Sequence, residues 1–177
     1  MINSDELLFV VDEDNNPLTP KPRKEVHRKG YWHRTAHIWI LNDQKQILCQ
    51  KRSILKDSSP GKWEPFFGGH MAPGEDYTEN ALIELEEELG IKSAKEDLHL
   101  YTIFKCESST EYQGVHYLIW NGDITSLHLE KDEIDHVEWM TLDDLYTKIV
   151  VNKDPDWSIM GYEKELIEYF KEVNTVQ

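Results

Sequence analysis

The sequence has few cysteines and no long hydrophobic segment. Among its 177 residues are two cysteines, Cys49 and Cys106, which argues against a disulfide framework and favours two buried, reduced thiols. No apolar run approaches the roughly 18 residues of a membrane span. The acidic start, MINSDELLFVVDEDN, lacks the basic region of a signal peptide. We therefore expect a cytoplasmic protein that does not bind a membrane.

Positive charge is also scarce. The chain has 19 lysines and arginines against 34 aspartates and glutamates, a net charge of -15. Such a surface repels nucleic-acid backbones and anionic membranes, so neither is expected as the main partner. A small phosphorylated ligand remains compatible, because a divalent cation on carboxylates can hold its phosphates. The length and the 39% hydrophobic content suit one domain spanning residues 1–177.

The hydrophobic pattern predicts strands interrupted by few helices, which indicates a mixed sheet with helices on its faces. Within residues 1–30 we expect an edge strand over 7–11 and a basic loop over 20–30, which either meets an anion or is simply solvated. Further along we expect a hairpin from 34–41 and 46–52, strands at 98–106, 114–120 and 134–140, a helix capped by Thr141, and a C-terminal helix over 158–172.

A short acidic helix is predicted over residues 77–89. Asp76 and Glu79 have the spacing of a capping box, and Gly90 stands where a glycine ends a helix. Helical periodicity predicts one buried stripe and one acidic face on the opposite side. The stripe contains Leu82, Leu85 and Leu89, and the acidic face contains Asn80, Glu84, Glu87 and Glu88.

Three carboxylates on one helix face have two interpretations. Glu84, Glu87 and Glu88 are either a solvated surface or the ligands of a hard cation. Gly68 and Gly69 lie just upstream, and their flexible backbone allows a carbonyl to join the glutamates. Mg²⁺ takes oxygen ligands and bridges to substrate phosphates. The pattern therefore favours metal-assisted attack of water on a pyrophosphate.

The stretch from Gly68 to Ile91 resembles the signature box of the Nudix hydrolases. Gly69 is followed by five residues and Glu75, and seven further residues lead to the run from Ile83 to Ile91, IELEEELGI. Every defined position matches except Ile83, where the family has arginine. Segments around the box look like the branch that includes isopentenyl-diphosphate isomerase and its hydrolase relatives. The resemblance covers residues 7–145 and implies an α/β/α sandwich around a mixed β-sheet.

The resemblance also implies functional residues. The metal ligands are the carboxylates of Glu84, Glu87 and Glu88 with the carbonyl of Gly68, and the cofactor is Mg²⁺, with Mn²⁺ as an alternative. Glu84 and Glu87 are expected to be catalytic, together with an acid on a later loop, which is Glu133 or its rivals Glu130 and Asp132. Residues expected on the substrate side are Arg52, Trp63, Phe66, His70 and Glu75. The aromatic residues Trp32, Trp63, Phe66 and Tyr112 are equally plausible as core.

Isomerase chemistry is disfavoured. The isomerase needs a cysteine before the Gly-His of its loop, where this chain has Gly68, and a Glu-x-Glu, of which only Glu111 remains. Proton transfer then lacks its donor and acceptor. His27, His33 and His70 resemble that enzyme's histidines, and hydrogen bonding is favoured over a second metal site for them.

The missing arginine is the main departure from the box. In the family it braces glutamates that include the equivalent of Glu75. We expect Ile83 to pack under the loop and Glu75 to take another donor, such as Lys51, Arg52 or His70. Loss of an orienting group typically costs about 10–100-fold, so a slow hydrolase is expected.

Two functions are therefore carried forward. The first is a metal-dependent pyrophosphohydrolase acting on a nucleoside diphosphate linked to another moiety, or on a related nucleotide. The second is a catalytically weak or inactive Nudix-fold protein that binds a nucleotide for regulation. The retained glutamates favour the first. A second copy of the chain is a further candidate partner, since dimers are common among such proteins.

Overall fold

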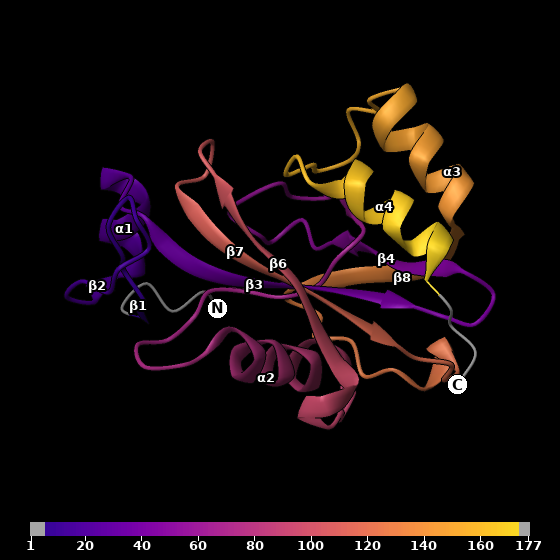
Figure 1. Ribbon diagram of the computed structural model, residues 1–177, viewed down its shortest axis with the longest axis horizontal. Coiled ribbons are helices and arrows are strands. Elements are labelled where there is room, and N and C mark those ends of the chain that lie inside the picture. Colours follow the sequence, from indigo (N-terminus) through magenta and orange to yellow (C-terminus); the bar gives the residue numbers. More distant parts are fainter. Residues whose placement is uncertain (1–5, 174–177) are drawn as a thin grey trace.

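A computed structural model describes residues 6–173. Its centre is a six-stranded mixed sheet in the order β5-β4-β3-β7-β6, with β8 paired to β4 (Figure 1). The strands are β3 (His33–Leu41), β4 (Gln46–Arg52), β5 (Trp63–Glu64), β6 (Leu98–Cys106), β7 (Glu111–Ile119) and β8 (Ile134–Thr141). The three later strands therefore confirm the expected ranges 98–106, 114–120 and 134–140 to within three residues.

The sheet register shows why β3 is the central strand. It pairs in parallel with β7 along its full length, from His33 to Leu41, while β6 pairs antiparallel with β7. The predicted hairpin of β3 and β4 is correct only beside its turn, where Leu41 pairs with Ile47. Beyond that point the strands diverge, because β4 pairs antiparallel with β8 instead.

Helices cover both faces of this sheet, as the expected sandwich requires. Helix α2 (Tyr77–Leu89) lies on one face, and α3 (Leu142–Tyr146), the π-helical turn Thr147–Val151 and α4 (Glu163–Glu172) lie on the other (Figure 1). Short 3₁₀ turns occupy Lys95–Asp97 and Ile124–Ser126. The C-terminal helix starts later than the predicted residue 158. Just before it, Gly161 has a φ of 117° and donates its N–H to the Glu163 carboxylate, a left-handed conformation that a helix cannot contain.

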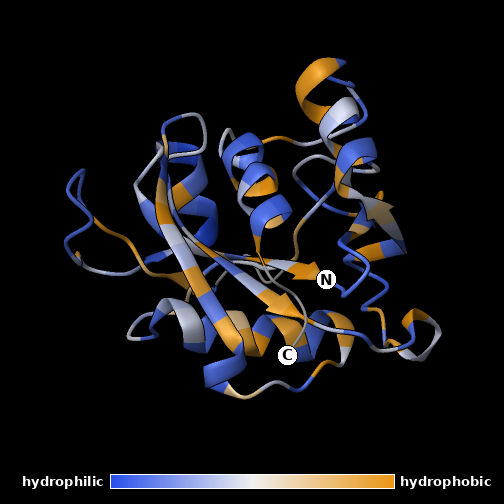
Figure 2. Ribbon diagram, turned by 45° about the vertical axis from the view of Figure 1, so that its right-hand side comes forward, coloured by the Kyte–Doolittle hydropathy of each residue, from blue (hydrophilic) through white to orange (hydrophobic). Residues whose placement is uncertain are grey.

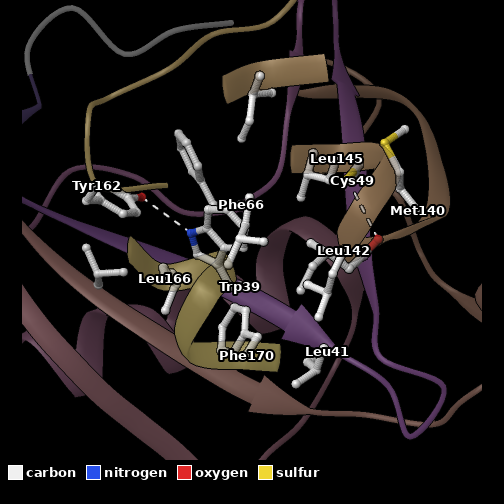
Figure 3. Packing of buried hydrophobic residues seen from close by; sticks show 14 of the residues in the cluster. Trp39, Leu41, Cys49, Phe66, Met140, Leu142, Leu145, Tyr162, Leu166 and Phe170 are labelled. Atoms are coloured by element: carbon white, nitrogen blue, oxygen red, sulfur yellow. Dashed lines mark hydrogen bonds between the residues drawn. The ribbon is translucent and has the colours of Figure 1, made fainter. Parts of the chain in front are cut away.

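Each face of the sheet has its own hydrophobic core. Leu85 and Leu89 of α2 pack with Ile38 on one side. On the other side, Phe170 of α4 and Trp39 of β3 are fully buried together (Figure 3). Successive residues Ile38 and Trp39 of β3 belong to different cores, because neighbouring side chains of a strand point to opposite faces. Colouring by hydropathy shows hydrophobic residues both on the strands and on the helices that cover them (Figure 2). These two cores fix α2 and the strands on which the site is built.

The N-terminal region corrects one prediction. A two-stranded sheet of β1 (Leu7–Leu8) and β2 (Lys21–Pro22) precedes α1 (Arg23–Lys29), a helix where the sequence predicted a loop. The helix forms because Val26 is buried in a small cluster with Leu8, and a Glu25–Lys29 ion pair of 2.9 Å supports one turn. Gly30 then ends the helix with a φ of 66°.

Two expectations from the sequence concern disulfides and membrane-spanning segments. Both Cys49 and Cys106 are free and buried, as predicted. Within residues 6–173, no helix is long and apolar enough to cross a bilayer.

Candidate active site

The acidic face of α2 lines a cavity of about 490 Å³. Glu84, Glu87 and Glu88 meet there, opposite Gly68 and Gly69. The capping box that starts α2 is confirmed, because Asp76 accepts hydrogen bonds from the N–H groups of Thr78 and Glu79 and the Glu79 side chain accepts the Asp76 N–H. The helix is therefore held at its first turn, and its glutamates project toward the glycine loop.

The burial of this face differs from the sequence prediction. Asn80 and Glu88 are 3% and 6% exposed, and Glu84 is partly buried, whereas Glu87 is exposed. Leu82 on the predicted buried stripe is only partly buried. The buried arc of α2 thus extends further round the helix than its leucines indicate, because the glycine loop covers part of the acidic face.

Both glycines are required by close approach. A Cβ at Gly69 would lie 2.4 Å from Glu84 Oε1, and a Cβ at Gly68 would lie 2.0 Å from the backbone oxygen of Ala36. Gly68 also has a φ of 129°, which L side chains rarely adopt. The Gly68 N–H donates a hydrogen bond of 3.0 Å to Glu88. Its carbonyl accepts no hydrogen bond from residues 6–173, so this oxygen is available to a ligand.

The clustered carboxylates are electrostatically unfavourable by themselves. Burial raises the pKa of Glu84 well above its usual value, and the negative charges of Glu88 and Glu87 raise it further. Burial raises the pKa of Glu88 to about 7, although the Gly68 N–H and Lys56 oppose the rise. Buried like charges require compensation. An all-oxygen donor set with excess negative charge fits a hard divalent cation such as Mg²⁺.

Three cationic side chains line the cavity, and each pairs with a carboxylate. Arg52 forms a 2.8 Å ion pair with the buried Glu64, and Lys56 forms an ion pair with Glu133. Burial and the nearby Arg52 charge lower the pKa of Lys56. Arg23 also lines the cavity, where it pairs with Glu6 at 3.3 Å. The cavity therefore holds carboxylates that suit a cation and, among them, cationic side chains that suit an anion.

The later acidic loop lies beside the box. The Glu130 N–H donates a 3.1 Å hydrogen bond to the Glu88 carbonyl, which ties the loop to the end of α2. Both Glu130 and Glu133 line the cavity, and Asp132 is not among its lining residues. Of the three acids weighed for the later position, two therefore have access to the site.

The hydrogen-bond donors to the Glu75 carboxylate differ from the expected ones. Its carboxylate accepts hydrogen bonds from the Ala72 N–H at 2.8 Å and from Asn80 Nδ2 at 3.1 Å. Among residues 6–173 its donors do not include Lys51, Arg52 or His70. Ile83 is 42% exposed, so the expectation that it packs under the loop is wrong. Asn80 was hard to identify from sequence, because helical spacing placed it on the acidic face.

The aromatic candidates do not form a stacking surface in the cavity. Trp63 stacks on Trp157 with ring centroids 5.9 Å apart, outside the lining. Phe66 does line the cavity but is 5% exposed, and the His37 ring covers it at 4.1 Å. The Tyr162 hydroxyl bonds His37 at 2.8 Å and also accepts the Trp39 indole N–H at 3.4 Å, which holds this stack in the core. Figure 3 shows the Trp39–Tyr162 bond beside Phe66.

The three histidines do come together. Ring nitrogens of His27, His33 and His70 lie within 4.8 Å of one another. His27 and His70 share a hydrogen bond of 3.0 Å, and His33 Nε2 lies 3.6 Å from Glu111. Burial alone would raise the pKa of Glu111, but the adjacent His33 lowers it to about 2. The cluster has both hydrogen bonds and the spacing of a metal site.

Sequence reasoning gave no role in the site to three residues that complete its surroundings, namely Arg23, Lys56 and Asn80, although it placed Asn80 on the acidic helix face. Arg23 lay in a stretch interpreted as a loop, and Lys56 lay in an unstructured stretch with no motif. Thr35 was also missed, and its hydroxyl is buried in the cavity wall without a partner among the described residues. Only the basic character of residues 20–30 gave a signal, because it suggested contact with an anion.

Comparison with known proteins supports the interpretation of the box. The family model of the NUDIX domain matches residues 31–159. An uncharacterised Nudix hydrolase of Clostridium acetobutylicum is 33% identical over 150 residues, which cover 80% of this chain and 72% of that protein. An isopentenyl-diphosphate Delta-isomerase of Photorhabdus laumondii is 28% identical over 162 residues, 90% of each chain. The resemblance to the branch containing that isomerase is thus confirmed.

A solved structure supports the fold. The crystal structure of a Deinococcus radiodurans protein superposes with a TM-score of 0.73 at 21% identity, covering 93% of this chain and 98% of that one. At this identity the similarity concerns the fold alone. It agrees with the α/β/α sandwich described above.

Proposed function

The chain belongs to the Nudix hydrolase family, and from this premise we propose that it is a metal-dependent pyrophosphohydrolase. Its substrate is a nucleoside diphosphate linked to another moiety, or a related diphosphate, and water attacks phosphorus. The observation that carries the proposal is the buried Glu88 and the partly buried Glu84 beside a third carboxylate. Such a cluster is stable in its charged form only with a compensating cation.

The ligand set for that cation is Glu84, Glu87, Glu88 and the carbonyl of Gly68. Mg²⁺ is the best match to four oxygens, and Mn²⁺ has similar preferences. When bound, the ion neutralises charge on the diphosphate and lowers the pKa of water. The protein's own contribution is to hold the ligands. The Gly68 N–H fixes Glu88, and the missing side chain of Gly69 leaves room for Glu84.

The cationic side chains of the cavity receive the diphosphate. Arg52, Lys56 and Arg23 all face this space, and guanidinium groups suit bidentate contact with phosphate oxygens. Lys56 is held by Glu133 until an anion competes for it. The unpartnered hydroxyl of Thr35 is a further donor to the ligand. These contacts orient the scissile bond toward the carboxylates.

Proton transfer from the attacking water needs a nearby carboxylate. Glu87 is exposed in the cavity and forms no hydrogen bond or ion pair within residues 6–173, so the oxygen of its carboxylate that does not bind the cation is the acceptor that the geometry favours. Glu84 is more enclosed, and Glu133 is engaged with Lys56. Glu87 therefore accepts the proton, and Glu133 positions Lys56.

Two observations weigh against isomerisation. The position of the isomerase cysteine is Gly68, whose backbone leaves no space for a Cβ. On β7, Glu111 is followed two residues later by Gln113, whose amide donates to Glu111 at 2.7 Å. A thiol and a carboxylate pair are thus both missing, and the reaction lacks its acid and base.

The arginine missing from the box has a substitute. Asn80 donates to Glu75 from within the same helix, so the loop before α2 keeps a brace. The replacement of the arginine by Ile83 should therefore slow hydrolysis less than the sequence indicates. This part of the proposal is tested by the Asn80 variant described in the Discussion.

A substrate panel tests the proposed function. Nucleoside diphosphates, nucleoside triphosphates and diphosphate sugars are incubated with and without Mg²⁺ in water labelled with heavy oxygen. Hydrolysis that needs Mg²⁺ and incorporates the label into a phosphate product supports the proposal. Binding of a panel compound without hydrolysis of any would favour the regulatory alternative.

A further inference from the structure

A buried histidine, His37, lies in the wall of the cavity that the α2 glutamates line. It follows Thr35 by two residues on β3, so both side chains point to the same face of the sheet. His37 is 6% exposed, and its ring is stacked on Phe66 with the centroids 4.1 Å apart. The ring is therefore held in one orientation at the edge of the core.

The two nitrogens of the His37 ring have different surroundings. Nδ1 lies 2.8 Å from the Tyr162 hydroxyl, on the core side of the ring. Nε2 forms no hydrogen bond within residues 6–173, and it is not among the buried side-chain atoms that lack a partner. Because His37 lines the cavity, Nε2 is the ring nitrogen that opens into it.

The Tyr162 hydroxyl determines which of these nitrogens carries the proton. Its oxygen accepts the indole N–H of Trp39 at 3.4 Å (Figure 3), and an indole nitrogen only donates. Tyr162 is 4% exposed, so its own proton needs an acceptor inside the protein, and His37 Nδ1 is the acceptor that it reaches among the described residues. A proton on Nδ1 would instead leave the hydroxyl proton buried without a partner, which is unfavourable.

His37 is therefore a neutral ring with its proton on Nε2. Burial lowers the pKa of His37 to about 4, although the charge of Glu111 opposes the change, so the ring is uncharged at neutral pH. Burial also raises the pKa of Tyr162 well above its usual value, so the hydroxyl keeps its proton. In this form Nε2 donates a hydrogen bond and accepts none.

This donor lies among groups that suit an anion. Beyond burial, the positive charge of Arg52 lowers the pKa of His37, which places the guanidinium within electrostatic range of the ring. Arg52 and Thr35 line the same cavity, and the Thr35 hydroxyl is buried without a partner in the described chain. A hydroxyl, a guanidinium and a neutral N–H together match the several acceptor oxygens of a diphosphate.

We propose that the Nε2–H of His37 donates a hydrogen bond to the diphosphate of the substrate, and that Tyr162 is the positioning residue that keeps the proton on this nitrogen. This inference rests on the proposed function and adds a donor from β3 to the cationic side chains. The ring orients the diphosphate toward the α2 carboxylates and transfers no proton.

Nitrogen NMR of the isotope-labelled protein tests the position of the proton. At neutral pH, with the His37 signals assigned by comparison with His37→Gln, Nε2 should have the shift of a protonated nitrogen and Nδ1 that of a nitrogen with a lone pair. Tyr162→Phe should move the Nδ1 signal toward that of a nitrogen that accepts no hydrogen bond. A protonated Nδ1 in wild type, or an Nδ1 signal that Tyr162→Phe leaves in place, would overturn the proposal.

Methylenediphosphonate, a diphosphate analogue with carbon in place of the bridging oxygen, tests the contact without turnover. In the presence of Mg²⁺ it should shift the His37 Nε2 signal of wild type, and His37→Met should weaken its binding in calorimetry about 10–100-fold. The matched variant is His37→Gln, because glutamine has the shape of methionine and keeps an amide N–H near the position of Nε2. It should bind the analogue at least about tenfold more tightly than His37→Met.

Two results would contradict a contact between His37 and the diphosphate. One is equal affinity of His37→Gln and His37→Met for the analogue, which would leave His37 a packing role alone. The other is a wild-type Nε2 signal that the analogue does not move.

The two proposals fail in different ways. If wild type hydrolyses no compound of the substrate panel, the proposed function is wrong, and the titration with methylenediphosphonate still decides the role of His37. If wild type hydrolyses a panel compound and the kcat/KM of His37→Met equals that of His37→Gln, the proposed function holds and the inference about His37 is wrong.

Discussion

Replacing Glu88 with glutamine is expected to stabilise the metal-free protein at alkaline pH. The Glu88 side chain is 6% exposed and shares its surroundings with Glu84, so its negative charge is unfavourable in the folded state. Glutamine keeps an oxygen that accepts the Gly68 N–H and carries no charge. The site would thus become more stable and lose its affinity for a cation.

The size of the effect follows from the pKa shift. The pKa of Glu88 rises from 4.5 in the unfolded chain to about 7 in the folded protein, and each unit corresponds to about 1.4 kcal/mol. A raised carboxyl pKa means that the folded state binds more protons than the unfolded chain. The contribution of protonated Glu88 to the free energy of unfolding is therefore fully present below pH 4.5 and is lost as pH rises through about 7. Ionised Glu88 therefore costs about 3 kcal/mol at pH 8 and under about 1 kcal/mol at pH 5.

Urea denaturation at pH 5 and pH 8 in the presence of a chelator measures this difference. Glu88→Gln should raise the free energy of unfolding by about 3 kcal/mol at pH 8 and much less at pH 5. The control is Glu86→Gln on the same helix, an exposed carboxylate paired with Lys92, which should change stability by less than about 0.5 kcal/mol at either pH. A Glu88→Gln protein no more stable than wild type at pH 8 would refute the reasoning.

Two further predictions concern the brace and the core. Asn80→Ala removes the donor to Glu75 and should lower kcat about 10–100-fold. Adding Ile83→Arg to that variant should restore much of the lost kcat, whereas Ile83→Arg alone should have little effect. A large gain in kcat from Ile83→Arg alone would contradict the proposal that Asn80 holds Glu75. Phe170→Ala empties a fully buried position beside Trp39 and should lower the free energy of unfolding by about 3–5 kcal/mol in urea titrations, with kcat per folded molecule unchanged.

Local signals predicted the elements that carry the box. The capping box at Asp76, the terminal glycine Gly90 and the leucine periodicity defined α2, because these interactions occur within one helix. Strand ranges were predictable because the runs of β-forming residues and the turn residues that bound them are also local in the sequence. The α/β/α arrangement itself came from the resemblance, since composition indicated only a mixed sheet with helices.

Contacts between distant segments could not be predicted. Helix α1 depends on burial of Val26 against Leu8, and the basic, proline-bearing sequence gives no periodic signal for it. The brace at Glu75 depends on how the loop folds over Asn80. A cavity of about 800 Å³ joins α1 to the β6–β7 turn and the loop after β4, three segments that are far apart in the sequence.

Phosphate release by Glu84→Gln and by Glu86→Gln tests the central claim most directly. Both variants remove one carboxylate from α2, but only Glu84 faces the cavity. On the panel diphosphate that wild type hydrolyses fastest, at increasing Mg²⁺, Glu84→Gln should be at least about 100-fold slower, and Glu86→Gln should match wild type. Equal Mg²⁺-dependent rates in the two variants would contradict a cation site on the buried face of α2.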